Sequence, residues 1–171
     1  VFSTINICWA AQASLYYHFG IKKEQVEDKV FGVFEHDVLI ENHVLTRGFT
    51  DTFLAPHSRH TKIEEEKLPN ISELDILAKS EDVGTLLVAT KDLRKIFMTG
   101  HIEYDADTLH NEYVRDKNSN LPIDIPVNYY PENDDEKAPK NRWRGVAYLF
   151  YHNWLNQVYQ LTPYDLTELG K

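Results

Sequence analysis

The fold is decided by residues 1–20, VFSTINICWAAQASLYYHFG. The first eight are mostly β-branched and apolar, which is typical of a buried strand. Trp9–Phe19 has apolar side chains at helical spacing, and Gly20 is a natural residue to end that helix. A strand that runs directly into a helix predicts an α/β fold and places Cys8 at the sharp junction between the two elements.

The rest of the chain continues the alternation of strands and helices. The patterns predict strands at 29–40, 74–78, 85–90 and 94–99, a further strand end at 100–104, and a strand leading into a polar loop at 48–60. They predict helices at 107–118 and 143–159 and a short charged helix or turn at 62–67. A proline-bearing loop is predicted at 121–140. Together they indicate an α/β sheet with some antiparallel hairpin.

We expect residues 1–171 to form one catalytic α/β domain. The chain begins inside a predicted strand, and Met98 is its only methionine. We therefore expect that an N-terminal part of the domain is missing from it.

Composition narrows the classes of protein and partner. The net charge is −9 and the pI is about 5.3, which argues against nucleic acid as a partner. We find no apolar run long enough to cross a bilayer and no signal-peptide pattern, so we expect no membrane partner. A single cysteine excludes an internal disulfide and fits a reducing cytoplasmic setting.

Cys8 has three interpretations: an inert core residue, a metal ligand or a nucleophile. A thiol at a helix N-terminus feels the positive end of the helix dipole, which favours the thiolate. The tight turn keeps the sulfur exposed, and the backbone N–H of Trp9 points to where a tetrahedral oxyanion would form. These features favour the nucleophile.

The segment GHIEY at 100–104 supplies a candidate base. On a strand end, residues two apart face the same side, so Glu103 can orient the imidazole of His101. Cys8, His101 and Glu103 then form a nucleophile–base–orienter arrangement.

Other polar residues have simpler interpretations. His57 and His60 flank Ser58, but a metal site needs three or four convergent ligands, so we predict no metal. His36 is expected to form a hydrogen-bonded structural pair with Glu35. The acidic residues at 132–136 are expected in a solvated loop, and the aromatic residues of 143–159 in the core or at a subunit contact.

Six segments, taken in chain order, resemble one known family. They are ICWAAQA (7–13), GVFEHDVL (32–39), RGFTDTFLAPHSRH (47–60), TGHIEYDADTL (99–109), NYYPENDD (128–135) and NWLNQVYQLTPYDL (153–166). They resemble the homoserine O-succinyltransferase and O-acetyltransferase family over essentially the whole chain. The resemblance implies a class I glutamine amidotransferase-like (flavodoxin-like) sheet with helices on both faces.

The resemblance also implies roles for individual residues. Cys8 takes the acyl group from coenzyme A as a thioester, His101 is the general base and Glu103 is its partner. Lys29, Ser58 and Arg115 contact the amino-acid substrate. An arginine fork suits an α-carboxylate, and Glu112, one helical turn before Arg115, can hold the guanidinium or receive the substrate ammonium.

The activity expected from this resemblance is an acyl-CoA-dependent, ping-pong O-acyltransferase that acts on L-homoserine in methionine biosynthesis. Acetyl-CoA or succinyl-CoA would be a co-substrate, with no permanently bound cofactor, and the protein would be a cytoplasmic homodimer. The residue that separates the two donors lies upstream of Val1 in the family. Three alternatives stay open: L-serine as acceptor, a cysteine-dependent amidotransferase or hydrolase, and a non-catalytic ligand-binding module.

Overall fold

The computed structural model describes residues 2–163 and 166–168, and their strands form one mixed sheet. Its order is β1-β6-β5-β4-β2-β3. The strands are β1 (Thr4–Ile7), β2 (Lys23–Val38), β3 (Thr52–Ile63), β4 (Leu74–Ser80), β5 (Gly84–Thr90) and β6 (Lys95–Met98). β1 pairs with β6 in parallel, and the other neighbours are antiparallel. The antiparallel share is larger than the sequence pattern indicated.

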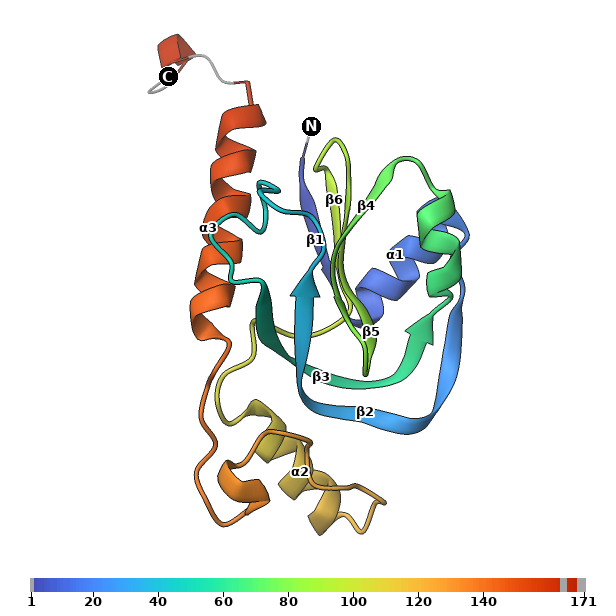
Figure 1. Cartoon of the computed structure of the whole chain (residues 1–171), viewed down its shortest axis with the longest axis vertical. Helices are drawn as coiled ribbons and strands as arrows, with labels where there is room; N and C mark the ends of the chain where they lie inside the picture. Colours follow the sequence, from blue (N-terminus) through green and yellow to red (C-terminus); the bar gives the residue numbers. More distant parts are fainter. Residues whose placement is uncertain (1, 164–165, 169–171) are drawn as a thin grey trace.

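The helices lie on both faces of this sheet, as the sequence predicted (Figure 1). They are α1 (Trp9–Phe19), α2 (Thr108–Asn118) and α3 (Arg144–Leu161), with short 3₁₀ helices η1 (Glu65–Asn70), η2 (Pro131–Asn133) and η3 (Leu166–Glu168). Gly20 ends α1 in the left-handed conformation, with φ 70°, and its N–H donates to Tyr16 O. None of the helices among the described residues is both long enough and apolar enough to span a bilayer.

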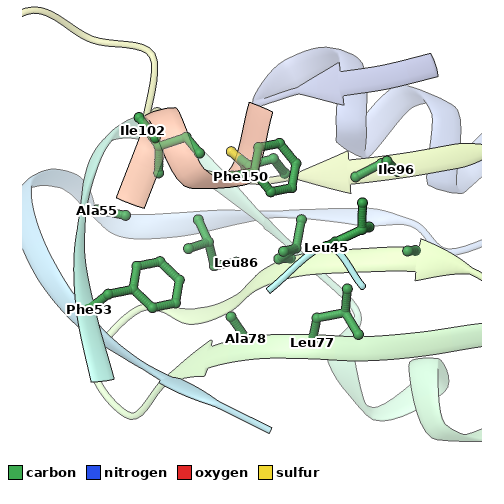
Figure 2. Close-up of a cluster of buried hydrophobic side chains, with 13 residues drawn as sticks. Leu45, Phe53, Ala55, Leu77, Ala78, Leu86, Ile96, Ile102 and Phe150 are labelled. Atoms are coloured by element: carbon green, nitrogen blue, oxygen red, sulfur yellow. The ribbon is translucent and has the colours of Figure 1, made fainter. Parts of the chain in front are cut away.

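Side-chain alternation along the strands builds a separate core on each face. In β6, Ile96 and Met98 pack in the cluster that contains Phe150 of α3, whereas Phe97 between them packs with Leu15 of α1. Figure 2 shows the first cluster, with Phe150 and Ile96 on the same side of the strands. Successive strand residues point to opposite faces, so a four-residue strand serves both cores.

A third core holds α2 and the proline-bearing loop against β2 and β3. Trp143, Leu109 and Tyr129 are buried there beside Phe31 and Val33 of β2. The side-chain N–H of Trp143 donates to the backbone oxygen of Tyr104 at 2.8 Å. This core packs α2 against β2, below the sheet in the view of Figure 1.

Two local predictions were wrong. Residues 100–104 form a turn and not a strand end, because β6 stops at Met98 and the N–H of His101 bonds to Pro56 O at 2.8 Å. The predicted polar loop within 48–60 is strand: β3 runs to Ile63, because it pairs with β2 from Thr52 onward. Polar side chains on β3 are thus held by a hydrogen-bonded sheet.

Candidate active site

Cys8 occupies a strained elbow between β1 and α1. Its backbone has φ 52° and ψ −114°, a conformation that non-glycine residues seldom adopt. The elbow is fixed on both sides: the N–H of Cys8 donates to Met98 O at 2.7 Å, and the N–H of Gln12 donates to Cys8 O at 3.2 Å. The side chain is partly exposed. This is the geometry that presents a nucleophile at the end of a sheet.

His101 approaches Cys8 from the turn after β6. Its Nδ1–H donates to Glu103 Oε1 at 2.6 Å, and the side chain of Cys8 is close enough to the imidazole to raise its pKa. One face of the ring stacks on Tyr104, with centroids 4.1 Å apart and planes 16° apart. The structure therefore brings Cys8, His101 and Glu103 together, although the turn that does so was predicted as a strand end.

The pKa of His101 reflects this environment. Burial lowers it, but the interactions with Cys8 and Glu103 and the negative charge of both groups outweigh burial and raise the pKa to about 9. The imidazole therefore carries a proton at neutral pH. A cationic imidazole beside a cysteine sulfur stabilises the thiolate.

A second polar cluster converges on Glu112 of α2. Its Oε1 accepts from Lys29 Nζ at 2.6 Å and from Ser58 Oγ at 2.8 Å. The Lys29 and Glu112 side chains are 17% and 19% exposed, so solvent screens the pair only in part. These three residues come from β2, β3 and α2, and no local pattern joins them.

Arg115 lies at the solvent edge of that cluster. Its side chain is 66% exposed and its Nη2 is 4.0 Å from Glu112, while both Nε and Nη2 lie 2.7 Å from Asp116 Oδ1. Asp116, which also lies 3.8 Å from Lys29 Nζ, is a member of the cluster that sequence reasoning missed. Its only signal was an acidic residue next to an arginine.

Ser58 joins the two clusters. Its hydroxyl donates to Glu112, and its backbone oxygen lies 4.0 Å from the sulfur of Cys8. Trp9 is the first residue of α1, where a backbone N–H has no partner within the helix. Its side chain is largely exposed.

The predicted pairing of His36 with Glu35 was wrong. His36 is fully buried and pairs with His57, Nε2 to Nε2 at 3.1 Å, whereas Glu35 is exposed. His57 is buried and His60 exposed. Within residues 2–163 and 166–168, no three His, Cys, Asp or Glu side chains are placed to hold a metal ion.

The sheet, its two covered faces and the elbow define the class of glutamine amidotransferase-like α/β proteins. A glutamine amidotransferase from Thermotoga maritima has this fold, with a TM-score of 0.62 at 16% identity over 90% of this chain and 61% of its own. A second, from Methylobacillus flagellatus, has a TM-score of 0.58 at 16% identity over 90% of this chain and 62% of its own. The predicted fold class is confirmed.

Within this class, the chain belongs to the homoserine O-succinyltransferase family, whose sequence model matches residues 1–164. A homoserine O-acetyltransferase from Petrotoga mobilis is 55% identical over the whole chain, and one from Clostridium botulinum is 52% identical over the same extent. The chain spans 56% of the length of each of these relatives. The predicted family is confirmed.

Proposed function

We propose that this chain carries the acyl-transfer site of a homoserine O-acyltransferase. One observation carries the proposal: a cysteine on a strained elbow lies beside a histidine that a glutamate holds at 2.6 Å, close enough to raise the pKa of that histidine. Cys8 would be the nucleophile, His101 the acid and base, and Glu103 the residue that orients the imidazole. Family membership supports the same reaction class.

The first half-reaction uses the protonated state of His101. The Cys8 thiolate attacks the thioester carbonyl of acyl-CoA, and the backbone N–H of Trp9 is available to the oxyanion. The C–S bond to coenzyme A breaks, and His101 gives its proton to the departing thiolate. The products are free coenzyme A, an acyl thioester on Cys8 and a neutral imidazole.

The second half-reaction reverses the proton transfer. Neutral His101 takes the proton from the acceptor hydroxyl, whose oxygen attacks the acyl thioester. The bond to the Cys8 sulfur breaks and the thiolate returns beside the imidazolium. Glu103 keeps Nδ1–H bonded throughout, so the nitrogen that faces Cys8 is always Nε2.

The cluster on Glu112 is suited to the amino-acid acceptor. Arg115 offers a planar fork for an α-carboxylate, and the carboxylate of Glu112 suits an α-ammonium. Ser58 contacts both this cluster, through its hydroxyl, and the sulfur of Cys8, through its backbone oxygen. An amino acid bound at the cluster would therefore direct its side-chain hydroxyl toward the acyl group on Cys8. We propose L-homoserine as acceptor, with L-serine, one methylene shorter, as the alternative.

The relatives support acetyl-CoA as the donor. The two cited above are named homoserine O-acetyltransferases, whereas the family description names the succinyl reaction. We propose acetyl-CoA and keep succinyl-CoA as the competing donor. No permanently bound cofactor is part of the proposal.

Intact-mass spectrometry of the full-length protein tests the nucleophile, donor and acceptor together. The protein is mixed separately with acetyl-CoA and succinyl-CoA without acceptor, beside a Cys8→Ala control. We expect an acetyl adduct that is absent from the control and is discharged by L-homoserine but not by L-serine.

The other outcomes are equally decisive. A succinyl adduct alone would change the donor and keep the mechanism. Discharge by L-serine would change the acceptor. If neither donor leaves an adduct, the acyltransferase proposal fails, and release of ammonia from glutamine would then identify a cysteine-dependent amidotransferase.

A further inference from the structure

Arg59 of β3 is a buried cation that forms no direct ion pair with the carboxylates among the described residues. The residue is 7% exposed, and no carboxylate among the described residues lies within ion-pair distance of its guanidinium. It donates instead to His57 Nδ1 at 3.4 Å, to Thr61 O at 2.6 Å and to Val83 O. Burial lowers the pKa of Arg59, and the negative charges of Cys8 and Glu65, which act from beyond ion-pair distance, oppose that effect only in part. Burying a charge in this way is costly, so the position of Arg59 calls for a functional explanation.

The contact from Arg59 fixes the proton positions in a chain of two histidines. Because Arg59 Nε–H donates to His57 Nδ1, the proton of neutral His57 is on Nε2. That Nε2–H donates to His36 Nε2 at 3.1 Å, so the proton of His36 is on Nδ1, from which it donates to Phe34 O at 3.0 Å. This single assignment of protons gives every ring nitrogen of the two histidines a hydrogen-bond partner. The series of hydrogen bonds begins at the Arg59 cation and ends at the backbone oxygen of Phe34.

His57, the first histidine of this hydrogen-bonded series, lies against the turn that carries His101. A Cβ atom on Gly100 would lie 2.8 Å from His57 Nε2 and 2.9 Å from His57 Cε1. The N–H of His101 bonds to the oxygen of Pro56, the residue before His57. Hence His57 supports the Gly100–His101 backbone through its ring, and its neighbour holds the same turn by a hydrogen bond.

The two imidazoles are also held neutral. Burial lowers the pKa of His57 well below its usual value, and the nearby His36, Arg59 and His101 lower it further. Burial likewise lowers the pKa of His36 to about 4, with the hydrogen bond to Phe34 O acting against it and Arg59 adding to it. Because the His57 ring is neutral, it does not repel the positive charge of the protonated His101.

We propose that Arg59 is a positioning residue for His101 and acts through the neutral ring of His57. By fixing the tautomer and orientation of His57, it fixes the surface on which Gly100 rests, and so the distance at which His101 meets Cys8. This rests on the proposed function only in taking His101 as the acid and base. The contact between His101 and Cys8 can be measured without an acyl donor.

Two substitutions of His57 separate positioning from packing. His57→Gln keeps a donor for His36 and an acceptor for Arg59, whereas His57→Leu fills similar space and leaves both unpaired. In the full-length enzyme we expect His57→Leu to lower kcat at least about tenfold with KM within about twofold. His57→Gln should stay within about threefold of the parent in both.

Arg59→Met should repeat the His57→Leu result, and the double variant should be no worse than either single one, because both break the same chain. The rate at which iodoacetamide alkylates Cys8, followed by peptide mass, gives a readout that needs no acyl-CoA. It should fall in His57→Leu and Arg59→Met and recover in His57→Gln. Asn153→Leu, which removes a comparably buried polar side chain from α3, is the control for lost stability alone.

The proposal is overturned if His57→Leu keeps the parent alkylation rate, if His57→Gln is as impaired as His57→Leu, or if the effects of Arg59→Met and His57→Leu add. Absence of an acyl adduct in the parent, with the alkylation pattern as expected, would overturn the proposed function and leave this inference standing.

Discussion

The sulfur of Cys8 lies 4.0 Å from the backbone oxygen of Ser58. The two residues are 50 positions apart in the chain, on the first elbow and on β3. Because the hydroxyl of the same serine binds Glu112, the nucleophile and the polar cluster on α2 are linked through one residue. The two halves of the proposed reaction can therefore be separated by substitutions of Ser58 and of its neighbours.

Ser58→Ala should impair the acceptor step alone. The variant keeps the backbone oxygen beside Cys8 and loses the 2.8 Å hydrogen bond to Glu112. A hydrogen bond to a charged group contributes about 1.5–3 kcal/mol, so we expect KM for the amino acid to rise about 10- to 100-fold. Stopped-flow release of coenzyme A should show an unchanged acylation rate. Slowed acylation with normal acceptor KM would contradict this assignment.

Glu103→Gln should lower the pKa of His101. The wild-type pKa is raised to about 9 by Cys8 and Glu103 against the lowering effect of burial. Loss of the carboxylate charge leaves burial less opposed, so the midpoint must move down. An NMR titration of the His101 ring protons measures it, and Cys8→Ala should also move it down. A midpoint unchanged in both variants would show that neither group sets the charge of His101.

The buried pair of histidines should make the protein sensitive to acid. His36 has a pKa of about 4 when folded and about 6.5 when unfolded, so the unfolded chain binds more protons between these values. The free energy of unfolding should fall by about 3 kcal/mol for His36 as the pH drops from 6.5 to 4, and none of this loss exists above pH 6.5.

Urea unfolding at a series of pH values measures that slope. His36→Gln should flatten it, whatever the variant costs at pH 7.5. His18→Gln is the matched control, since His18 is exposed in the last turn of α1. An equally steep loss in His36→Gln would assign the acid sensitivity to other groups.

Gly100→Ala should displace His101. The added Cβ would lie 2.7 Å from Leu86 Cδ1 and 2.8 Å from His57 Nε2. The His57 ring cannot move away without breaking its hydrogen bonds to His36 and Arg59. We expect kcat to fall by about 10- to 100-fold, the cost of a misplacement near 1 Å. Gly145→Ala, where a Cβ meets nothing within 4 Å, should leave kcat unchanged. Normal kcat in Gly100→Ala would show that this contact does not position the base.

The elements that were predicted well depend on nearby residues. The bounds of α1 were correct, because apolar spacing and Gly20 mark them within the segment itself. α2 was placed within one residue. The turn at 100–104 was misassigned, because its shape depends on Pro56, which lies on β3 and does not appear in the local pattern. The prediction of a polar loop within 48–60 was wrong for a similar reason: pairing with β2 makes this segment a strand despite its polar composition.

The sequence by itself determined the elbow at Cys8, the candidate base at His101, the fold class and the family. The elbow and the base follow from residues close together along the chain, where spacing and caps set the backbone, whereas the family and its fold follow from six motifs spread over the chain. Only the tertiary structure decided that His36 pairs with His57 across 21 residues and that Lys29 pairs with Glu112 across 83. Such contacts depend on strand register and on the docking of α2. These arise from the packing of the whole sheet, which no short segment encodes.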